Sequence, residues 1–394
     1  MQELPLGFDL AAVQAGFRYK DRPDLALIFS RTPARAAGVF TTNAFQAAPV
    51  QVGRENLDRS DLMRAVLVNA GQANACTGDE GLADCRSTLD MLAGHLDISP
   101  GEILPASTGV IGMRMPMPVW EKSLPQLVKS LGGCTPEQSA MAIMTTDSFP
   151  KTASRETGLD QGRVRFWGMA KGAGMICPDM ATMLAFVLTD LQMDGPRWQE
   201  MLAGAVEQSF NAITVDGDTS TNDCVLALAG GESGVSCQSS RDRDRAFQAL
   251  EEVCSDLAYQ IVKDAEGGTK VMHIRITGAA DSLDACRAAR AVGNSSLVKT
   301  AMFGCDPNWG RIVAALGRSG AGFDPEKVRL SLAGQEIFAR GKPVDMDIDE
   351  VFAPLLTARD IRVDIDLGTG EGEYFLMASD LTDEYIRINS DYRS

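Results

Sequence analysis

Histidine is nearly absent from this sequence of 394 residues, which contains only His95 and His273. A catalytic triad with a histidine base and a zinc site of the usual His/Cys type are therefore poorly supported. The nine cysteines include no C-x-x-C pair, and their odd number is typical of free thiols rather than a disulfide framework. We accordingly expect a cytoplasmic protein that holds no metal.

Long apolar runs and an excess of basic residues are also missing. No run reaches the roughly 18 residues that a membrane-spanning helix needs, and the start, "MQELPLGFDL", has no basic stretch of the secretory type. The formal net charge of −16 disfavours binding to nucleic acid. Lys171 is followed by Gly172 and Gly174, but this spacing does not fit a nucleotide-binding loop. We therefore expect no nucleic-acid partner and no membrane.

Strand-like and helix-like segments alternate along the whole chain. Helical spacing is clear over 87–98, with Ser87 as the expected cap, and over 135–144, where Thr135 and Pro136 form a cap and first-turn pair. The pattern predicts an α/β fold with mixed sheets in layers. We expect the domain boundary at about 181–195, after the segment "KGAGMICPDMATMLAF". The strands expected from apolar runs are 24–30, 64–70, 163–170, 183–190 and 224–230.

The segment "KGAGMICPDMATMLAF" places Thr182 between a loop rich in glycine and proline and an apolar strand. A β-branched residue is common at the start of a strand, which is the ordinary interpretation. The alternative is that the chain is cut between Ala181 and Thr182. The new α-amine would then serve as the base for the Thr182 hydroxyl, as in enzymes with an amino-terminal nucleophile.

Three other segments are candidates for chemistry. "PASTGVIG" places Thr108 and Gly109 where a strand meets a turn, as either an oxyanion hole or an ordinary turn. "KDAEGGTKV" contains Glu266, which either binds a cationic substrate group or simply charges the surface. "FNAITVDGDTSTND", residues 210–223, has three acidic residues among turn formers and is expected to be a solvated loop.

The segment "KGAGMICPDMATMLAF" closely resembles the self-processing motif of the glutamate N-acetyltransferases, also called ornithine acetyltransferases, of arginine biosynthesis. Further segments resemble those of the same family in the same order, so the resemblance spans nearly the whole chain. They are "VNAGQANACTG", "PASTGVIG", "AIMTTD", "FNAITVDGDTSTND", "DAEGGTKV", "VKTAMFGCDPNWGRI" and "YIRINSDYRS".

The resemblance implies a two-domain layered α/β sandwich of the ornithine acetyltransferase/DmpA-like type. It also implies self-cleavage into an α chain (1–181), which carries the oxyanion loop, and a β chain (182–394), which begins with the nucleophile and ends with a substrate-binding tail. The cleaved chains would assemble as α2β2. Thr182 would be the nucleophile, and Thr108 and Gly109 would stabilise the oxyanion. The positions that match substrate-binding residues are Thr145, Lys171, Thr182, Glu266, Asn389 and Ser394.

The activity implied is transfer of the acetyl group from N2-acetylornithine to glutamate through an acetyl ester on Thr182. No organic cofactor is expected, because the acetyl group moves directly between the substrates. The sequence leaves open whether acetyl-CoA is also a donor. An amidohydrolase or aminopeptidase with an amino-terminal nucleophile remains the alternative, since it would share the cut and the nucleophile but pass the acyl group to water.

Overall fold

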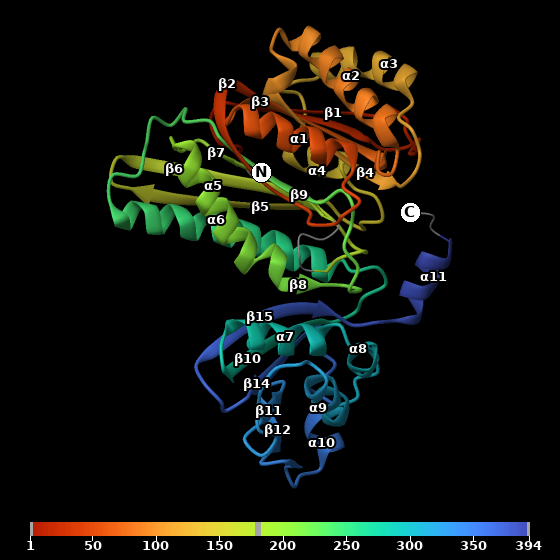
Figure 1. Cartoon of the computed structure of the whole chain (residues 1–394), viewed down its shortest axis with the longest axis vertical. Coiled ribbons are helices and arrows are strands. Elements are labelled where there is room, and N and C mark those ends of the chain that lie inside the picture. The colour runs from red at the N-terminus through yellow and green to blue at the C-terminus, as the bar shows by residue number, and fades with distance from the viewer. Residues whose placement is uncertain (1–2, 178–182, 392–394) are drawn as a thin grey trace. The chain divides into compact units, whose positions relative to one another are not determined.

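The computed structural model describes residues 3–177 and 183–391, which form two compact units with a sheet each (Figure 1). The first unit runs to Asn211 and resumes at Asp218–Ile261, and the second contains Ala212–Gly217 and the chain from Val262 onward. The boundary expected at 181–195 is therefore wrong, because strand β7 (Leu184–Thr189) lies inside the sheet of the first unit.

The first sheet bends back on itself through its longest strand, β2 (Leu25–Phe40). The first part of β2 pairs with β3 (Leu62–Gln72), the last part pairs with β9 (Cys224–Ala229), and the register shifts between Phe29 and Ala34. The strand order is β4-β3-β2-β9-β7-β6-β5, and β1 pairs with β2. The remaining bounds are β1 Phe8–Val13, β4 Ile103–Val110, β5 Lys151–Leu159 and β6 Gly162–Lys171.

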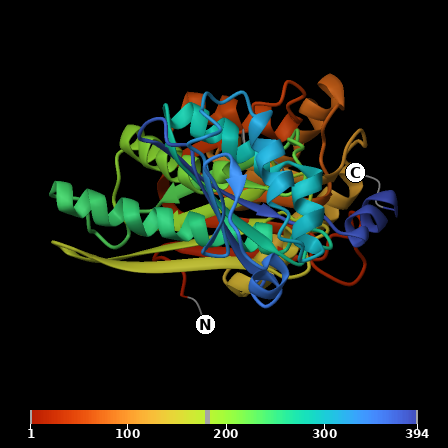
Figure 2. The ribbon, with the colours of Figure 1, turned by 90° about the horizontal axis from the view of Figure 1, so that it is seen from below.

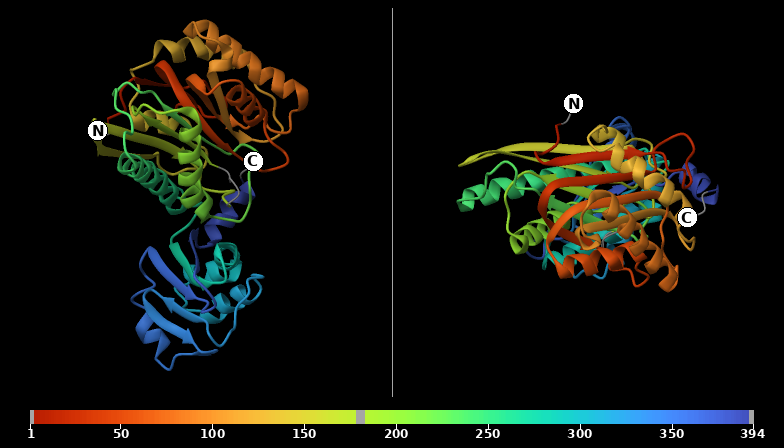
Figure 3. Two further views of the ribbon diagram at one scale, coloured as in Figure 1. Left: turned by 60° about the vertical axis from the view of Figure 1, so that its left-hand side comes forward. Right: turned by 90° about the horizontal axis from the view of Figure 1, so that it is seen from above.

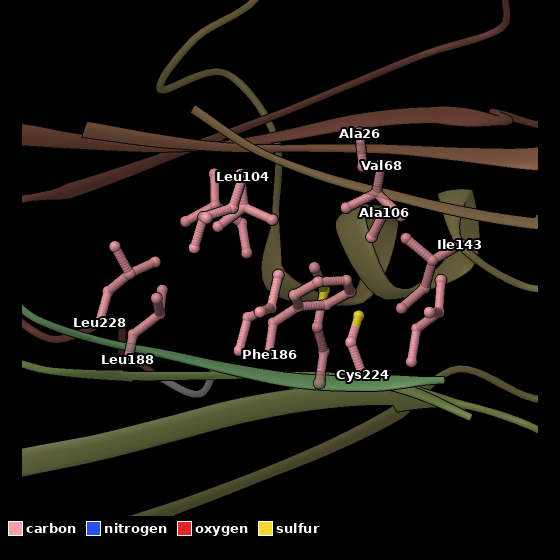
Figure 4. Close-up of a cluster of buried hydrophobic side chains, with 14 of the residues drawn as sticks. Ala26, Val68, Leu104, Ala106, Ile143, Phe186, Leu188, Cys224 and Leu228 are labelled. Carbon is pink, nitrogen blue, oxygen red and sulfur yellow. The ribbon is translucent and has the colours of Figure 1, made fainter. Parts of the chain in front are cut away.

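A core of apolar side chains fills the space between the two halves of this sheet. Leu104 and Val68 point into it from one half, and Phe186, Leu188 and Leu228 point into it from the other (Figure 4). Because successive residues of a strand face opposite sides, β7 also presents apolar side chains outward. Every residue of β7 is buried, so this strand needs cover on both faces.

Helices cover the outer faces of the first sheet. Leu89 of α2 and Trp120 of α3 pack in one apolar cluster with Leu67 of β3. On the other side, α6 lies beside the long β5–β6 hairpin (Figure 2), where the side chain of Leu257 approaches Gly168. The helices are α1 Ala48–Arg59, α2 Gly78–Leu96, α3 Met117–Lys129, α4 Pro136–Ala142, α5 Gly195–Gln208 and α6 Ser240–Lys263.

One of the two expected helix caps is confirmed. The Thr135 hydroxyl accepts a hydrogen bond from the Gln138 amide, and the Gln138 side chain bonds back to the Thr135 amide. The cap expected at Ser87 is wrong, because α2 begins at Gly78 and Ser87 lies inside it. Two acidic residues in the first turn of α2 favour this earlier start through their interaction with the helix dipole.

The second unit is a mixed sheet with helices on one face (Figure 3). Strand β10 (Val271–Ala279) pairs parallel with β14 and antiparallel with β15, and its Ile274 clusters with Val292 of α7. The strand order is β13-β12-β11-β14-β10-β15-β8. The remaining bounds are β8 Ile213–Thr214, β11 Arg329–Leu332, β12 Gln335–Ala339, β13 Lys342–Pro343, β14 Asp360–Asp366, β15 Gly372–Ser379, α7 Ser282–Gly293, α8 Ser296–Phe303, α9 Trp309–Gly317, α10 Ile348–Phe352 and α11 Asp383–Asp391.

Two mixed sheets with helices layered on them confirm the expected α/β class. Within the two described ranges, no helix has both the length and the apolar character that crossing a membrane requires.

Candidate active site

Strands β3 and β4 approach each other unusually closely at a pair of glycines. Gly71 and Gly109 are register partners, and their φ angles of +116° and +132° are ones that residues with side chains rarely adopt. A Cβ atom added to Gly109 would lie 2.2 Å from the carbonyl carbon of Gly71. Thr108, one of the two expected oxyanion residues, immediately precedes this contact and is 6% exposed. The site therefore requires glycine at 109 for steric reasons alone.

Replacing Gly109 with alanine should destabilise the protein, because the new methyl group would collide with the backbone of β3 at a disfavoured φ. We expect a loss of about 1–3 kcal/mol in the free energy of unfolding, measured by chemical denaturation. Gly158→Ala in β5 is the matched control, since nothing lies within 4 Å of the added Cβ. Equal stability of the two variants would contradict the close approach.

Buried amide and hydroxyl groups hold the ends of β3 and β4 in place. The Ser107 hydroxyl donates to Oδ1 of Asn69 at 2.6 Å, and Nδ2 of Asn69 donates to the carbonyl oxygen of Gln72 at 3.0 Å. Asn222 reaches the same place from a different loop, with Nδ2 donating to the carbonyl oxygens of Ser107 at 2.9 Å and Ala73 at 2.6 Å. The backbone next to Thr108 is therefore fixed from two directions.

The expectation that 210–223 is a solvated loop is wrong at both ends, since most of 210–215, including β8, is buried and so are the last four residues. Most of the polar groups of these last four residues are hydrogen-bonded within the protein, which allows burial. The Thr41 hydroxyl donates to the carbonyl oxygen of Ser220, the Thr41 amide donates to that of Asp223, and the Thr221 hydroxyl donates to Oδ1 of Asn222. The buried residues are Ser220, Thr221, Asn222 and Asp223.

The carboxyl group of Asp223 is hydrogen-bonded to the backbone of Met183, the residue that directly follows Thr182. Its Oδ1 accepts a hydrogen bond from the Met183 amide at 2.9 Å. Asp223 is 1% exposed, and its Oδ2 has no hydrogen-bond partner among the described residues. Burial raises the pKa of Asp223 well above its usual range, against the opposing effects of the Met183 amide, Lys171 and Ser220.

Asp147 interacts with two of the expected substrate-binding residues of the first unit, Thr145 and Lys171. Its Oδ2 accepts a hydrogen bond from the Thr145 amide at 2.9 Å. Its Oδ1 accepts one from Nζ of Lys151 at 2.6 Å and one from the amide of Gly172, the residue after Lys171, also at 2.6 Å. One buried carboxyl group thus ties the Thr145 loop to the end of β6.

Two lysines place positive charge near this buried carboxyl group. Burial alone would raise the pKa of Asp147, but the positive charges of Lys171 and Lys151, with the hydrogen bonds from Lys151 and Gly172, hold it well below its usual range. The side chains of Asp147 and Lys151 are both 0% exposed. Lys171 also interacts electrostatically with Asp223, so two buried acidic residues with opposite pKa shifts share one lysine.

The second unit brings together two other expected substrate-binding residues. Oε2 of Glu266, in the loop between α6 and β10, accepts a hydrogen bond from Nδ2 of Asn389 in α11 at 2.7 Å. The adjoining Gly267 has a φ angle of +67°, and its carbonyl oxygen accepts a hydrogen bond from the Thr382 hydroxyl. Glu266 is 9% exposed, so it is not the simple surface charge that was the ordinary interpretation.

Three of the expected site residues, Ala181, Thr182 and Ser394, lie outside the described residues. Sequence reasoning missed three that the structure places at the site: Asp147, Asn222 and Asp223. The signal was present, since all three lie within "AIMTTD" and "DGDTSTND". No group of three or more His, Cys, Asp or Glu residues that is suited to a metal ion occurs in the described ranges.

Comparison with known proteins gives matches over the full length of the chain. The chain is 55% identical over 394 residues to the arginine biosynthesis bifunctional protein ArgJ of Nitratidesulfovibrio vulgaris, with 100% of both sequences covered. It is 46% identical over 390 residues to the protein of the same name from Syntrophotalea carbinolica, which covers 98% of this chain and 99% of the relative.

Two solved structures are also similar. The crystal structure of arginine biosynthesis bifunctional protein ArgJ from Bacillus halodurans is 36% identical, with a TM-score of 0.49, and the match covers 52% of this chain and 96% of that one. The structure of ornithine acetyltransferase complexed with ornithine from Mycobacterium tuberculosis is 37% identical, with a TM-score of 0.41 and coverage of 44% and 92%. The ArgJ family model matches residues 9–394, and with relatives of this identity it shows that the chain belongs to the ArgJ family.

Proposed function

We propose that this enzyme of the ArgJ family transfers the acetyl group from N2-acetylornithine to glutamate in arginine biosynthesis. Support comes from the family and from the printed names of its relatives, which are arginine biosynthesis bifunctional proteins. A solved relative with 37% identity is an ornithine acetyltransferase complexed with ornithine. The names of these relatives support the proposed substrate class, and the chemistry below is assigned to residues of this chain.

The enzyme first activates itself by cutting the bond between Ala181 and Thr182. The Thr182 hydroxyl attacks the Ala181 carbonyl carbon, the acyl group shifts from nitrogen to oxygen, and water hydrolyses the resulting ester. The products are an α chain (1–181) and a β chain (182–394). The freed α-amine of Thr182 titrates at about 7.7–8.0 in the absence of perturbation, so it is partly neutral near pH 7 and suited to carrying a proton.

In the first half-reaction, Oγ of Thr182 attacks the acetyl carbonyl of N2-acetylornithine while the α-amine takes the hydroxyl proton. The oxyanion that forms is stabilised by the hydroxyl of Thr108 and the amide of Gly109. The proton then passes to the departing amine, and ornithine leaves. In the second half-reaction, the amine of glutamate attacks the acetyl ester, and its proton returns through the α-amine to Oγ of Thr182.

Charge complementarity assigns substrate recognition to the remaining residues. Lys171 pairs with the α-carboxylate of the substrate, and Glu266 holds the side-chain ammonium of ornithine. Thr145, Asn389 and Ser394 complete the substrate contacts. The acetyl group moves directly between the two amino acids, so the reaction calls on no organic cofactor.

The observation that best supports this proposal is the connection around Asn222 and Asp223. One of these neighbouring side chains holds the backbone beside Thr108, and the other holds the backbone directly after Thr182. An acyl-transfer site needs its nucleophile and its oxyanion donors fixed relative to each other, and this pair of contacts serves both.

The test is a product assay with purified protein, N2-acetylornithine and glutamate. Ornithine and N-acetylglutamate should form in equal amounts, with ping-pong kinetics because one site serves both half-reactions. Release of free acetate in place of N-acetylglutamate would contradict the proposal and favour the amidohydrolase alternative. A parallel assay with acetyl-CoA as the sole donor decides whether the enzyme also acetylates glutamate by that route.

The proposal includes an assembly and a location. We assign the cleaved chains to an α2β2 heterotetramer in the cytoplasm, where both small-molecule substrates are available. Sedimentation of the purified enzyme measures the assembly directly.

A further inference from the structure

Two neighbouring buried side chains, Asn222 and Asp223, reach in different directions from the start of β9. Asn222 is 5% exposed and Asp223 1% exposed. The two amide hydrogens of Asn222 go to the carbonyl oxygens of Ser107 and Ala73, at the ends of β4 and β3. Oδ1 of Asp223 accepts a hydrogen bond from the amide of Met183, at the start of β7. Within the first unit, this dipeptide therefore links three strands.

We propose that Asn222 and Asp223 are a positioning pair, in which Asn222 fixes the backbone beside Thr108 and Gly109 while Asp223 fixes the backbone amide of Met183, directly after Thr182. This inference rests on the proposed function and deepens it. Neither side chain is assigned a contact with substrate. Because the two residues are adjacent in the chain, displacement of one contact is transmitted to the other through a single peptide bond.

The position of the Met183 contact makes the effect of Asp223 on the nucleophile direct. Met183 directly follows Thr182 in the sequence, so the hydrogen bond from its amide to Asp223 restrains the backbone next to the proposed nucleophile. A second restraint acts one residue on, where the Cys224 amide donates to the Met183 carbonyl oxygen at 3.3 Å. Misplacement of reacting groups by about 1 Å can cost on the order of 100-fold in rate.

The chemical state of Asp223 follows from its surroundings. Burial raises the pKa of Asp223 well above its usual range, and Oδ1 can accept the Met183 amide whether the carboxyl group is charged or neutral. Asparagine has the same shape and keeps this acceptor. Leucine has a similar volume but offers no acceptor, so it removes the hydrogen bond and leaves the Met183 amide buried without a partner.

The first experiment compares Asp223→Asn and Asp223→Leu by steady-state kinetics of acetyl transfer. Asp223→Leu should lower kcat and kcat/KM by the same factor, about 100-fold, because a positioning contact acts on the transition state. Asp223→Asn should lose less than about tenfold and keep the pH profile of kcat. If Asp223→Asn is as impaired as Asp223→Leu, or its acidic limb disappears, Asp223 acts as an ionising group and the proposal is overturned.

Asn222→Leu tests the positioning role of Asn222 in the same assay. It leaves two buried carbonyl oxygens without their donor, and we expect kcat to fall by about 100-fold. Asn56→Leu is the matched control, because Nδ2 of Asn56 donates to the carbonyl oxygen of Ile103 at the opposite end of β4 at 2.9 Å. The two variants should lose comparable stability, but only Asn222→Leu should lower kcat. A similar kcat for both variants would overturn the positioning role of Asn222.

Asp190→Leu is the corresponding control for Asp223→Leu. Asp190 directly follows β7 at its other end and accepts the backbone amides of Arg165 and Leu6. It lies about 23 Å along the chain from Met183 at the usual rise of a strand. Asp190→Leu should reduce stability without a matching loss of kcat. A loss equal to that of Asp223→Leu would show that any damage to β7 suffices, which would overturn the positioning role.

Amide hydrogen exchange separates failure of this inference from failure of the proposed function. Asp223→Leu should accelerate exchange at Met183 by at least about tenfold relative to wild type, whereas Asp223→Asn should leave it protected. If the wild-type protein transfers no acetyl group, the proposed function fails, and the Met183 contact is then judged by exchange alone. Unchanged exchange in Asp223→Leu would overturn the inference whatever the activity of the wild type.

Discussion

Thr182→Ala should leave the protein as a single chain of 42.2 kDa with no detectable acetyl transfer. The alanine side chain has no oxygen to attack the carbonyl of Ala181, so the bond stays intact and the α-amine is never released. Loss of an acyl-transfer nucleophile costs on the order of 10⁶-fold in kcat. Intact-mass spectrometry measures the cut, and the assay with N2-acetylornithine and glutamate measures the transfer.

Two further variants make this result specific to the hydroxyl group of Thr182. Thr182→Ser keeps the oxygen and should still be cut and active, at a reduced rate. Thr189→Ala removes the hydroxyl of a buried threonine at the far end of β7, whose Oγ1 accepts a hydrogen bond from the amide of Leu191 at 3.2 Å. It should be cut and active like the wild type. A processed, active Thr182→Ala enzyme would refute the mechanism.

The elements with the strongest apolar patterns could be predicted from the sequence. The run expected at 183–190 is β7, and the one expected at 163–170 is β6, each correct within two residues. β7 is buried along its whole length and is a continuous apolar run, whereas only the second half of β6 is buried throughout. β5 was not predicted, because its half-buried residues "KTASRETGL" carry charges that pair with α6. The strand β5 is stabilised by its partner strand and helix, and these contacts cannot be predicted from the sequence of β5 alone.

Only part of the candidate site could be predicted from the sequence. The resemblance singled out Thr108, Gly109 and Lys171, because such motifs mark residues expected to meet substrate. Asp147 and Asp223 were passed over, since an acidic residue among turn formers usually lies in solvent. Only the fold reveals that these two carboxyl groups are buried, that burial raises the pKa of Asp223, and that two nearby lysines hold the pKa of Asp147 low. Their roles depend on residues distant in the sequence, which a local pattern does not contain.

Asp147→Asn should be strongly destabilising, because it removes the negative charge between two buried lysines. The carboxylate accepts hydrogen bonds through both oxygens, from Lys151 and Gly172 on one side and Thr145 on the other. An asparagine there must turn its NH2 group toward one of these donors. Breaking a buried ion pair by removing one partner costs about 3–5 kcal/mol. Acetyl transfer should fall as well, because the Thr145 loop and the end of β6 lose their common anchor.

Chemical denaturation as a function of pH tests whether the stabilisation by Asp147 is lost in acid. The pKa of Asp147 is lower in the folded protein than in the unfolded chain, where it is about 3.9, so its contribution to stability is complete above about pH 5 and is lost progressively as the pH falls. The stability difference between wild type and Asp147→Asn should therefore narrow by about 1 kcal/mol between pH 7 and pH 3. Asp256→Asn is the control, because its ion pair with Arg155 is partly exposed and contributes at most about 1 kcal/mol. Equal losses for the two variants at pH 7, or a gap that widens in acid, would mean that Asp147 is not a buried carboxylate held ionised by its lysines.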